Sequence, residues 1–417
     1  MSKVNIDRCC LDVDGLKVIV IPKPEFQTSY AFYATRYGSI NNSFTFNKKH
    51  YDLPEGIAHF LEHKMFEKKY GDIFNKYSEY GADANAFTSF DITGYLFSAS
   101  NNFYESLDVL CELVNEPYFT PETVAKEQGI IGQEIKMGLD NPNNRCFYSL
   151  LENMFYNHPV KIDIAGSVES ISKITSELLY ACHDAFYRPS NMVLCVAGNV
   201  DKDRVAEIVS KRIRKTSEEK PVSIFKPEPA ETVSSGSEMF AEVSSPLFCI
   251  GIKDSFDKTG LELVKHKYAV ELILNYLCGK SSNFYNRLYR EGYLNDKFST
   301  ETLYVENAGA IILSGESKDP DIVFSVFKEE LSNRLKNDID IKMFNRLKNK
   351  MYGEQLAALD STEDIAIAFA TAFFEGVSFA ETFNILGNLT ISDIEDTLKY
   401  FDVSKLTKSV VKPLQRR

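Results

Sequence analysis

Residues 56–66 of the chain read Gly-Ile-Ala-His-Phe-Leu-Glu-His-Lys-Met-Phe. Apolar residues recur at helical spacing in this stretch, and Leu53-Pro54-Glu55 offers a proline and an acid for its start, so we expect a helix that begins at these residues. On a helix, His59 and His63 share one face, and both imidazoles can reach a single metal ion. Glu62 projects from nearly the same side, close enough to act on a water at that metal without being a ligand.

The pattern H-x-x-E-H is the inverted form of the H-E-x-x-H signature of zinc proteases. A pattern with only three fixed positions also occurs by chance. The alternative interpretation is an amphipathic helix whose histidines lie at the surface or are satisfied within the core. A third ligand favours the metal, because a catalytic zinc ion takes three protein ligands and keeps one position open.

A pair of carboxylates downstream could supply that third ligand. Glu127 and Glu134 lie seven residues apart within Glu122–Leu139, a stretch that predicts a helix. Seven residues are about two helical turns, so both carboxylates lie on one face. This spacing suits one metal ligand and one acid that orients a ligating histidine. The spacing alone leaves open which acid has which role.

Four motifs follow one another across most of the first half of the chain. They are residues 56–66, residues 81–89 (Gly-Ala-Asp-Ala-Asn-Ala-Phe-Thr-Ser), the pair Glu127 and Glu134, and residues 187–200 (Tyr-Arg-Pro-Ser-Asn-Met-Val-Leu-Cys-Val-Ala-Gly-Asn-Val). In this order they resemble the M16 (pitrilysin or insulinase-like) family of zinc metallopeptidases, which is related to mitochondrial processing peptidase.

The resemblance implies a peptidase whose Zn²⁺ is held by His59, His63 and Glu134. It makes Glu62 the general base and Glu127 the acid beside a ligating histidine. A second hypothesis is a non-catalytic scaffold subunit of a two-chain peptidase of this type, although every expected metal-site residue is present. A third is a metal-dependent hydrolase that acts on bonds other than peptide bonds.

The resemblance also implies how a substrate is held. The stretch Asn85–Ser89, which by itself predicts a plain edge strand, would pair with an extended peptide through main-chain hydrogen bonds. Asn85 and Ala86 are the substrate-binding residues that this implies. In the second half, Arg290 and Tyr293 are further candidates, although the spacing there departs from the family pattern and a solvated helix end is the alternative.

The resemblance implies a catalytic chamber built from four homologous domains, and the pattern of this chain indicates two. We therefore expect a homodimer, or a heterodimer with a related chain. The composition is that of a globular protein of 417 residues with a net charge of −12 and an isoelectric point near 5.2. This acidic balance argues against a nucleic-acid partner.

The N-terminus has no apolar signal core, and no later run is long enough to span a bilayer. A cytoplasmic protein without membrane contact is therefore expected. The eight cysteines form no C-x-x-C pair. We interpret them as small buried hydrophobic residues in a reducing compartment.

The order of strand and helix patterns predicts an α+β protein. Strands are expected at Leu16–Ile21, Tyr30–Thr35, Asn85–Ser89, Gly94–Ser98 and Met192–Ala197, and helices at Asp72–Tyr80, Asp108–Asn115, Glu122–Leu139 and Thr175–Phe186. We expect two homologous two-layer domains, each an antiparallel-type sheet packed against helices. Residues 1–215 would form the catalytic metal-binding domain, 216–235 a charged linker, and 236–417 a domain without metal ligands.

The second half repeats the first in pattern and spacing. Residues 94–100 and the helix after them parallel residues 309–315 and a helix at Ile322–Leu331. At a similar offset Gly81 aligns with Gly292. The three motif residues His59, Glu62 and His63 then fall on the apolar residues Val270, Ile273 and Leu274. This repeat keeps the helix and loses the metal groups.

Overall fold

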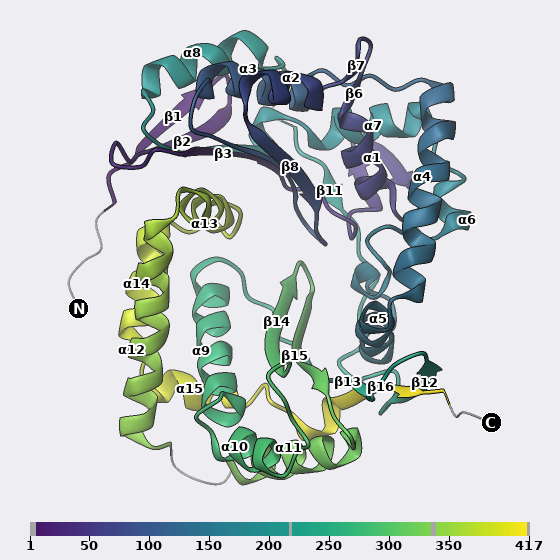
Figure 1. Ribbon diagram of the computed structural model, residues 1–417, viewed down its shortest axis with the longest axis vertical. Coiled ribbons are helices and arrows are strands. Elements are labelled where there is room, and N and C mark those ends of the chain that lie inside the picture. The colour runs from purple at the N-terminus through teal and green to yellow at the C-terminus, as the bar shows by residue number, and fades with distance from the viewer. Residues whose placement is uncertain (1–5, 217–218, 335–338, 415–417) are drawn as a thin grey trace.

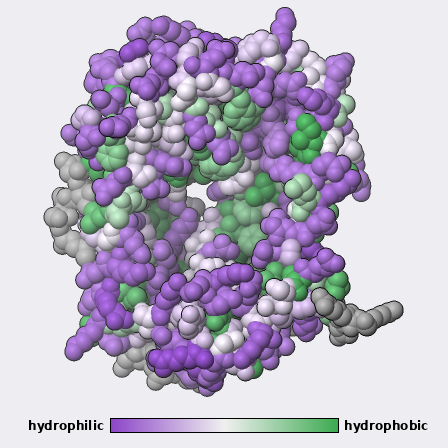
Figure 2. All heavy atoms as spheres, in the orientation of Figure 1, coloured by the Kyte–Doolittle hydropathy of each residue, from purple (hydrophilic) through white to green (hydrophobic). Residues whose placement is uncertain are grey.

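The computed structural model of the chain describes residues 6–216, 219–334 and 339–414. The first half of the chain builds the upper part of the molecule in Figure 1 and the second half the lower part. A hollow lies between them, with apolar residues on its walls (Figure 2). Residues 217 and 218 of the predicted linker, and residues 1–5 of the segment predicted to lack a signal core, lie outside the described residues.

The first sheet contains six strands in the order β1-β2-β10-β3-β9-β8. Their bounds are β1 Cys9–Val13, β2 Leu16–Pro22, β3 Ser29–Thr35, β8 Asp83–Thr88, β9 Thr93–Ala99 and β10 Met192–Gly198. All five predicted strands are present. Their neighbours run antiparallel except that β10 is parallel to β2, so the sheet is mixed. A parallel neighbour needs a crossover connection, and the helices between β3 and β10 supply it.

Helices cover one face of this sheet. They are α1 Ile57–Met65, α2 Phe74–Tyr80, α3 Phe103–Asn115, α4 Pro121–Asp140, α7 Ser176–Phe186 and α8 Lys202–Arg212. Strand β2 shows how the sheet is buried: Val18 and Val20 face this helical layer, while Ile19 and Ile21 belong to a second core on the other face. Because both faces are covered there, residues 18–21 of the strand form an unbroken apolar run.

The second sheet has five strands in the order β12-β16-β13-β15-β14. Their bounds are β12 Ser237–Ala241, β13 Leu247–Asp254, β14 Ser299–Val305, β15 Ala308–Glu316 and β16 Leu406–Pro413. The helices of this half are α9 Gly260–Cys278, α10 Asn283–Arg290, α11 Pro320–Arg334, α12 Ile341–Ala357, α13 Thr362–Phe374, α14 Phe379–Asn388 and α15 Ile391–Leu398.

The two halves share one topology, in agreement with the repeat read from the sequence. Strands β10, β3, β9 and β8 correspond to β16, β13, β15 and β14, and each sheet contains one parallel pair, β2–β10 and β12–β16. Helices α2 and α10 end alike, because Gly81 and Gly292 have φ angles of 70° and 72°. Helix α9 corresponds to α1 and buries Val270, Ile273 and Leu274.

Each half covers the sheet of the other half with one helix. Helix α5 (Pro142–Met154) packs against β13 and β16 of the second sheet, and α13 packs against β3 and β10 of the first sheet. The two contacts lie on opposite sides of the molecule (Figure 1). Both are apolar: Phe369 and Ile365 contribute to one core, and Leu150 and Met154 to the other.

The segment that connects the two halves is held to both of them by a strand pairing, hydrogen bonds and an ion pair. Strand β11 (Val222–Ser223) pairs with β4 (Ser43–Phe46). Further on, Glu228 accepts backbone hydrogen bonds from residues 156–158 and lies 2.6 Å from Lys253 Nζ. The predicted domain boundaries at residues 215 and 236 remain a prediction. The remaining short elements are β5 Lys49–Asp52, β6 Glu67–Lys68, β7 Gly71–Asp72, α6 Val168–Ile171 and four single 3₁₀ turns.

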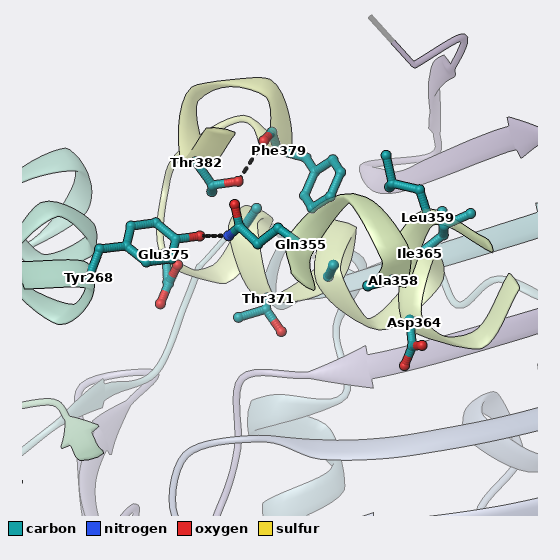
Figure 3. A pocket seen from close by; sticks show the side chains of 12 residues that line it. Tyr268, Gln355, Ala358, Leu359, Asp364, Ile365, Thr371, Glu375, Phe379 and Thr382 are labelled. Carbon is teal, nitrogen blue, oxygen red and sulfur yellow. Dashed lines mark hydrogen bonds between the residues drawn. The ribbon is translucent and has the colours of Figure 1, made fainter. Parts of the chain in front are cut away.

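A pocket of about 200 Å³ lies among α9, α12, α13 and α14 and is lined by Tyr268, Gln355 and Phe379, among others (Figure 3). Within the described residues, no single helix is long and apolar enough to cross a bilayer. Helices α13 and α14, bent by 85° at the break between them, reach that length and apolarity only as a pair.

Candidate metal centre

Helix α1 carries the H-x-x-E-H motif and is fixed by its apolar face. Phe60 and Leu61 are fully buried, which leaves His59, Glu62 and His63 on the opposite side. Metal-binding atoms of these three side chains all lie within 4.8 Å of one another. The expected helix is confirmed, and its spacing gathers three possible ligands at one point.

The start of α1 differs from the prediction. The helix begins at Ile57, and its first turn contains no acidic residue, so Pro54-Glu55 precedes the helix. Gly56 makes the entry with a left-handed φ of 86°. A Cβ at Gly56 would lie 2.3 Å from the backbone oxygen of Ala165. Glycine is therefore required here by both the backbone angle and the close approach.

Helix α4 brings Glu134 to both histidines. The Nε2 atoms of His59 and His63 each lie 3.6 Å from a Glu134 carboxylate oxygen. Donor atoms about 2.1 Å from a tetrahedral zinc ion are roughly 3.4 Å apart. The observed separations therefore fit a set of two imidazoles and one carboxylate around one zinc ion. Glu134 is about half exposed, which leaves one side of the cluster open.

Glu127 holds the other nitrogen of one histidine. Its Oε1 lies 3.2 Å from His63 Nδ1, and its side chain is only 12% exposed. A carboxylate at Nδ1 fixes the ring orientation and directs Nε2 toward Glu134. Glu127 and Glu134 therefore both lie beside the two histidines, and the roles assigned to them remain a prediction. By contrast, His59 Nδ1 is buried and has no hydrogen-bond partner among the described residues.

The surroundings of the two histidines shift their pKa values in opposite directions. Burial, together with the charge of the neighbouring His63, lowers the pKa of His59 to about 4, against the opposing charge of Glu127. His59 is therefore neutral at pH 7, the form that binds metal. Burial also acts to lower the pKa of His63, but the hydrogen bond with Glu127 and the nearby carboxylates outweigh it and raise the pKa above its ordinary value.

Glu62 lies in a less polar environment than the other acids. Burial raises its pKa, while the charge of His63 and a hydrogen bond from Thr88 oppose the rise. Thr88 Oγ1 donates to Glu62 Oε2 at 3.1 Å. Our sequence analysis did not find Thr88 as a site residue. The alternation of β8 could have indicated it, because Ala84, Ala86 and Thr88 share the less exposed face of that strand.

Strand β8 ends the order of the first sheet. The Ala86 N–H donates to Asn85 Oδ1 at 2.9 Å on the exposed side. Arg290 and Tyr293 do not join this group. Helix α10, which ends at Arg290, lies at the bottom of Figure 1, and α1 lies at the upper right. Tyr293 instead lies under Lys318, with the Nζ 4.2 Å from the ring centre.

The family described as Insulinase (Peptidase family M16) matches residues 49–168, and the Peptidase M16 inactive domain matches residues 173–351. The chain belongs to peptidase family M16. Relatives are similar over nearly their whole length. The M16 chain is 40% identical to an uncharacterized zinc protease, YmfH, of Bacillus subtilis, over 93% of this chain and 91% of the relative.

Solved structures agree with the M16 assignment. A putative M16-like peptidase from Alicyclobacillus acidocaldarius is 32% identical, with a TM-score of 0.96 over 99% of this chain and 100% of the other. Pitrilysin shows the same fold at 15% identity, with a TM-score of 0.76 over 98% of this chain and 45% of its own. The M16 chain thus spans about half the length of pitrilysin.

Proposed function

We propose that this M16 protein is a zinc-dependent peptidase that hydrolyses extended peptides. The observation that carries the proposal is the convergence of His59 Nε2 and His63 Nε2 on Glu134, each at 3.6 Å. These three residues would hold Zn²⁺. When bound there, zinc would supply Lewis acidity toward a peptide carbonyl and make a water molecule more acidic.

Glu62 is the proposed general base. Its raised pKa and its place beside the histidines suit it to take a proton from the attacking water and to deliver it to the leaving amine. Thr88 holds the carboxylate in position through its hydrogen bond to Oε2. Glu127 keeps His63 in the orientation that binds metal.

Strand β8 is the proposed place for the substrate backbone. An extended peptide can add to the edge of a sheet through main-chain hydrogen bonds, which makes the binding tolerant of sequence. A substrate carbonyl would take the Ala86 N–H that Asn85 Oδ1 now accepts, and the Asn85 amide would then be free to bind the peptide. Both residues keep the substrate-binding roles that the family resemblance implies.

A partner chain completes the proposed enzyme, as a second copy or as a related chain. Arg290 and Tyr293 could meet a substrate at α1 only from such a partner, since α10 and α1 lie at opposite ends of the molecule (Figure 1). A scaffold subunit is the second candidate function, since a peptidase M16 inactive domain from Pseudomonas fluorescens shares the fold at 16% identity. The complete metal cluster argues against it. A cytoplasmic location remains a prediction.

The test is hydrolysis of a mixed peptide library by the zinc-loaded chain, with Glu62→Gln and Glu79→Gln alongside. Glu79 is an exposed acid on α2 and is the matched control. We expect cleavage by the parent and by Glu79→Gln, and none by Glu62→Gln, which should still bind zinc. Activity that survives in Glu62→Gln would overturn the proposed chemistry. No cleavage by the parent, even with a partner chain supplied, would favour the scaffold.

A further inference from the structure

Two cysteines from different halves of the chain meet where α5 crosses the second sheet. Cys146 lies on α5 and Cys249 on β13. The helix packs closely on the strand: a Cβ at Gly251 would lie 3.1 Å from Leu150 Cδ2. Cys146 is one helical turn before Leu150, and Cys249 is two residues before Gly251 on the same face of the strand. A hydrogen bond joins the two thiols, so they face each other.

The surroundings of the two thiols make them unequal. Cys146 Sγ donates to the backbone oxygen of Ser409 at 3.3 Å. A hydrogen bond from the Cys249 thiol lowers the pKa of Cys146, and nearby backbone amides of Cys249 and Val411 add to this against burial. The same contact, together with burial, raises the pKa of Cys249. Cys146 is thus the thiol that ionises first, and the thiolate is the reactive form.

A cavity gives access to the pair. Cys146 and Cys249 both line a cavity of about 470 Å³, whose walls also carry Lys297 and Glu301. The pair belongs to the apolar core beneath α5, and the cavity gives a small polar oxidant a route to it. Four other buried cysteines of the described residues, Cys111, Cys182, Cys195 and Cys278, lie in apolar cores and do not line this cavity. Burial raises the pKa of each of these four thiols.

We propose that Cys146 and Cys249 form an oxidative modification site, at which a hydroperoxide such as H₂O₂ converts the two thiols into a disulfide joining the two halves of the chain. The Cys146 thiolate attacks one peroxide oxygen and the O–O bond breaks. The other oxygen departs as hydroxide, and Cys146 becomes a sulfenic acid. The Cys249 sulfur then attacks the Cys146 sulfur and expels the sulfenic oxygen as hydroxide. The two thiol protons complete two molecules of water, so the peroxide is reduced as the thiols are oxidised.

The bond would fix α5 onto β13. This contact is one of the two apolar contacts that hold the halves together, and the disulfide would make it covalent. The modification does not depend on the metal cluster, because neither cysteine lies on α1 or α4. It can therefore be tested with zinc removed.

The test uses the full chain, fully reduced, freed of metal by a chelator and treated with H₂O₂. Free thiols are then alkylated, and the peptides are mapped by mass spectrometry without reduction. We expect one cross-linked peptide pair, Cys146 with Cys249, and the loss of two of the eight thiols on titration in denaturant. Dithiothreitol should restore all eight.

Variants separate a specific pair from general oxidation. Cys146→Ser and Cys249→Ser should each abolish the cross-link, while Cys10→Ser, at an exposed cysteine outside the pair, should retain it. Circular dichroism verifies that each variant is folded. If a serine variant is unfolded, the peptide map of the parent protein decides whether the Cys146–Cys249 cross-link forms. Retention of all eight thiols would overturn the proposal. Over-oxidation of Cys146 beside an intact Cys249 thiol would also overturn it.

Discussion

Replacing Glu127 tests the orientation of His63, one of the two proposed metal-binding histidines. The carboxylate lies 3.2 Å from His63 Nδ1 and is largely shielded from water, at 12% exposed. Without it, the ring is free to turn, and Nδ1 loses its charged partner. Acids in this position change metal affinity by roughly 10- to 100-fold, which is about 1.4–2.7 kcal/mol.

We expect Glu127→Ala to weaken zinc binding near the upper end of that range, because the lost bond is shielded. Glu127→Gln keeps an oxygen acceptor without the charge, so its loss should be intermediate. The assay is competition for zinc with a chromophoric chelator at pH 7. Glu122→Ala is the control, since Glu122 lies on the same helix and is exposed.

Thermal unfolding of the metal-free variants accompanies the assay and shows whether a weaker affinity reflects a damaged fold. Zinc binding by folded Glu127→Ala as tight as that of the parent would refute the reasoning. The hydrogen bond to His63 would then be incidental to the metal site.

Two further predictions concern stability. In chemical denaturation, Gly56→Ala should reduce the free energy of unfolding more than Gly81→Ala. Both variants carry the roughly 1–2 kcal/mol of strain of a left-handed backbone. Only the alanine at position 56 would also press its Cβ against a backbone oxygen. Equal losses would contradict this close approach. Acidification should destabilise the fold through His158. This side chain is buried; its Nε2 is hydrogen-bonded with the Glu306 carbonyl, and its Nδ1 accepts the Val160 N–H. Burial lowers the pKa of His158 to about 4, so on acidification the imidazole is protonated in the unfolded chain before it is protonated in the folded chain. The free energy of unfolding should therefore fall by up to about 3 kcal/mol as the pH drops from about 6.5 to about 4. His158→Gln should be less stable at pH 7 but lose this part of the pH dependence.

The candidate metal site could be predicted from the sequence in part, because the spacing within each of its two helices is local. His59 and His63 are one helical turn apart, and Glu127 and Glu134 are two turns apart, so helical periodicity alone places each pair on one face. The approach of α4 to α1 is tertiary, and the spacing could not show it. Only the family resemblance brought the two helices together before the structure did.

Other features depend on contacts between distant segments and escaped prediction. The parallel pairing of β10 with β2 joins strands that are far apart in the chain, and no residue pattern marks it. The coverage of each sheet by a helix from the other half escaped for the same reason. Thr88 was missed because the prediction weighed β8 as a peptide-binding edge and did not consider the face of the strand that meets α1.

Helices α5 and α13, each of which packs on the sheet of the other half, restrict how the two halves can move. Two domains joined by a single linker can rotate away from each other. Here α5 and α13 attach the two halves at opposite sides of the molecule, and both contacts are apolar. Swinging either side open would expose buried aromatic and aliphatic groups such as Phe369 and Leu150 to water. Opening either contact would therefore cost buried apolar area, so we expect the two halves to move together.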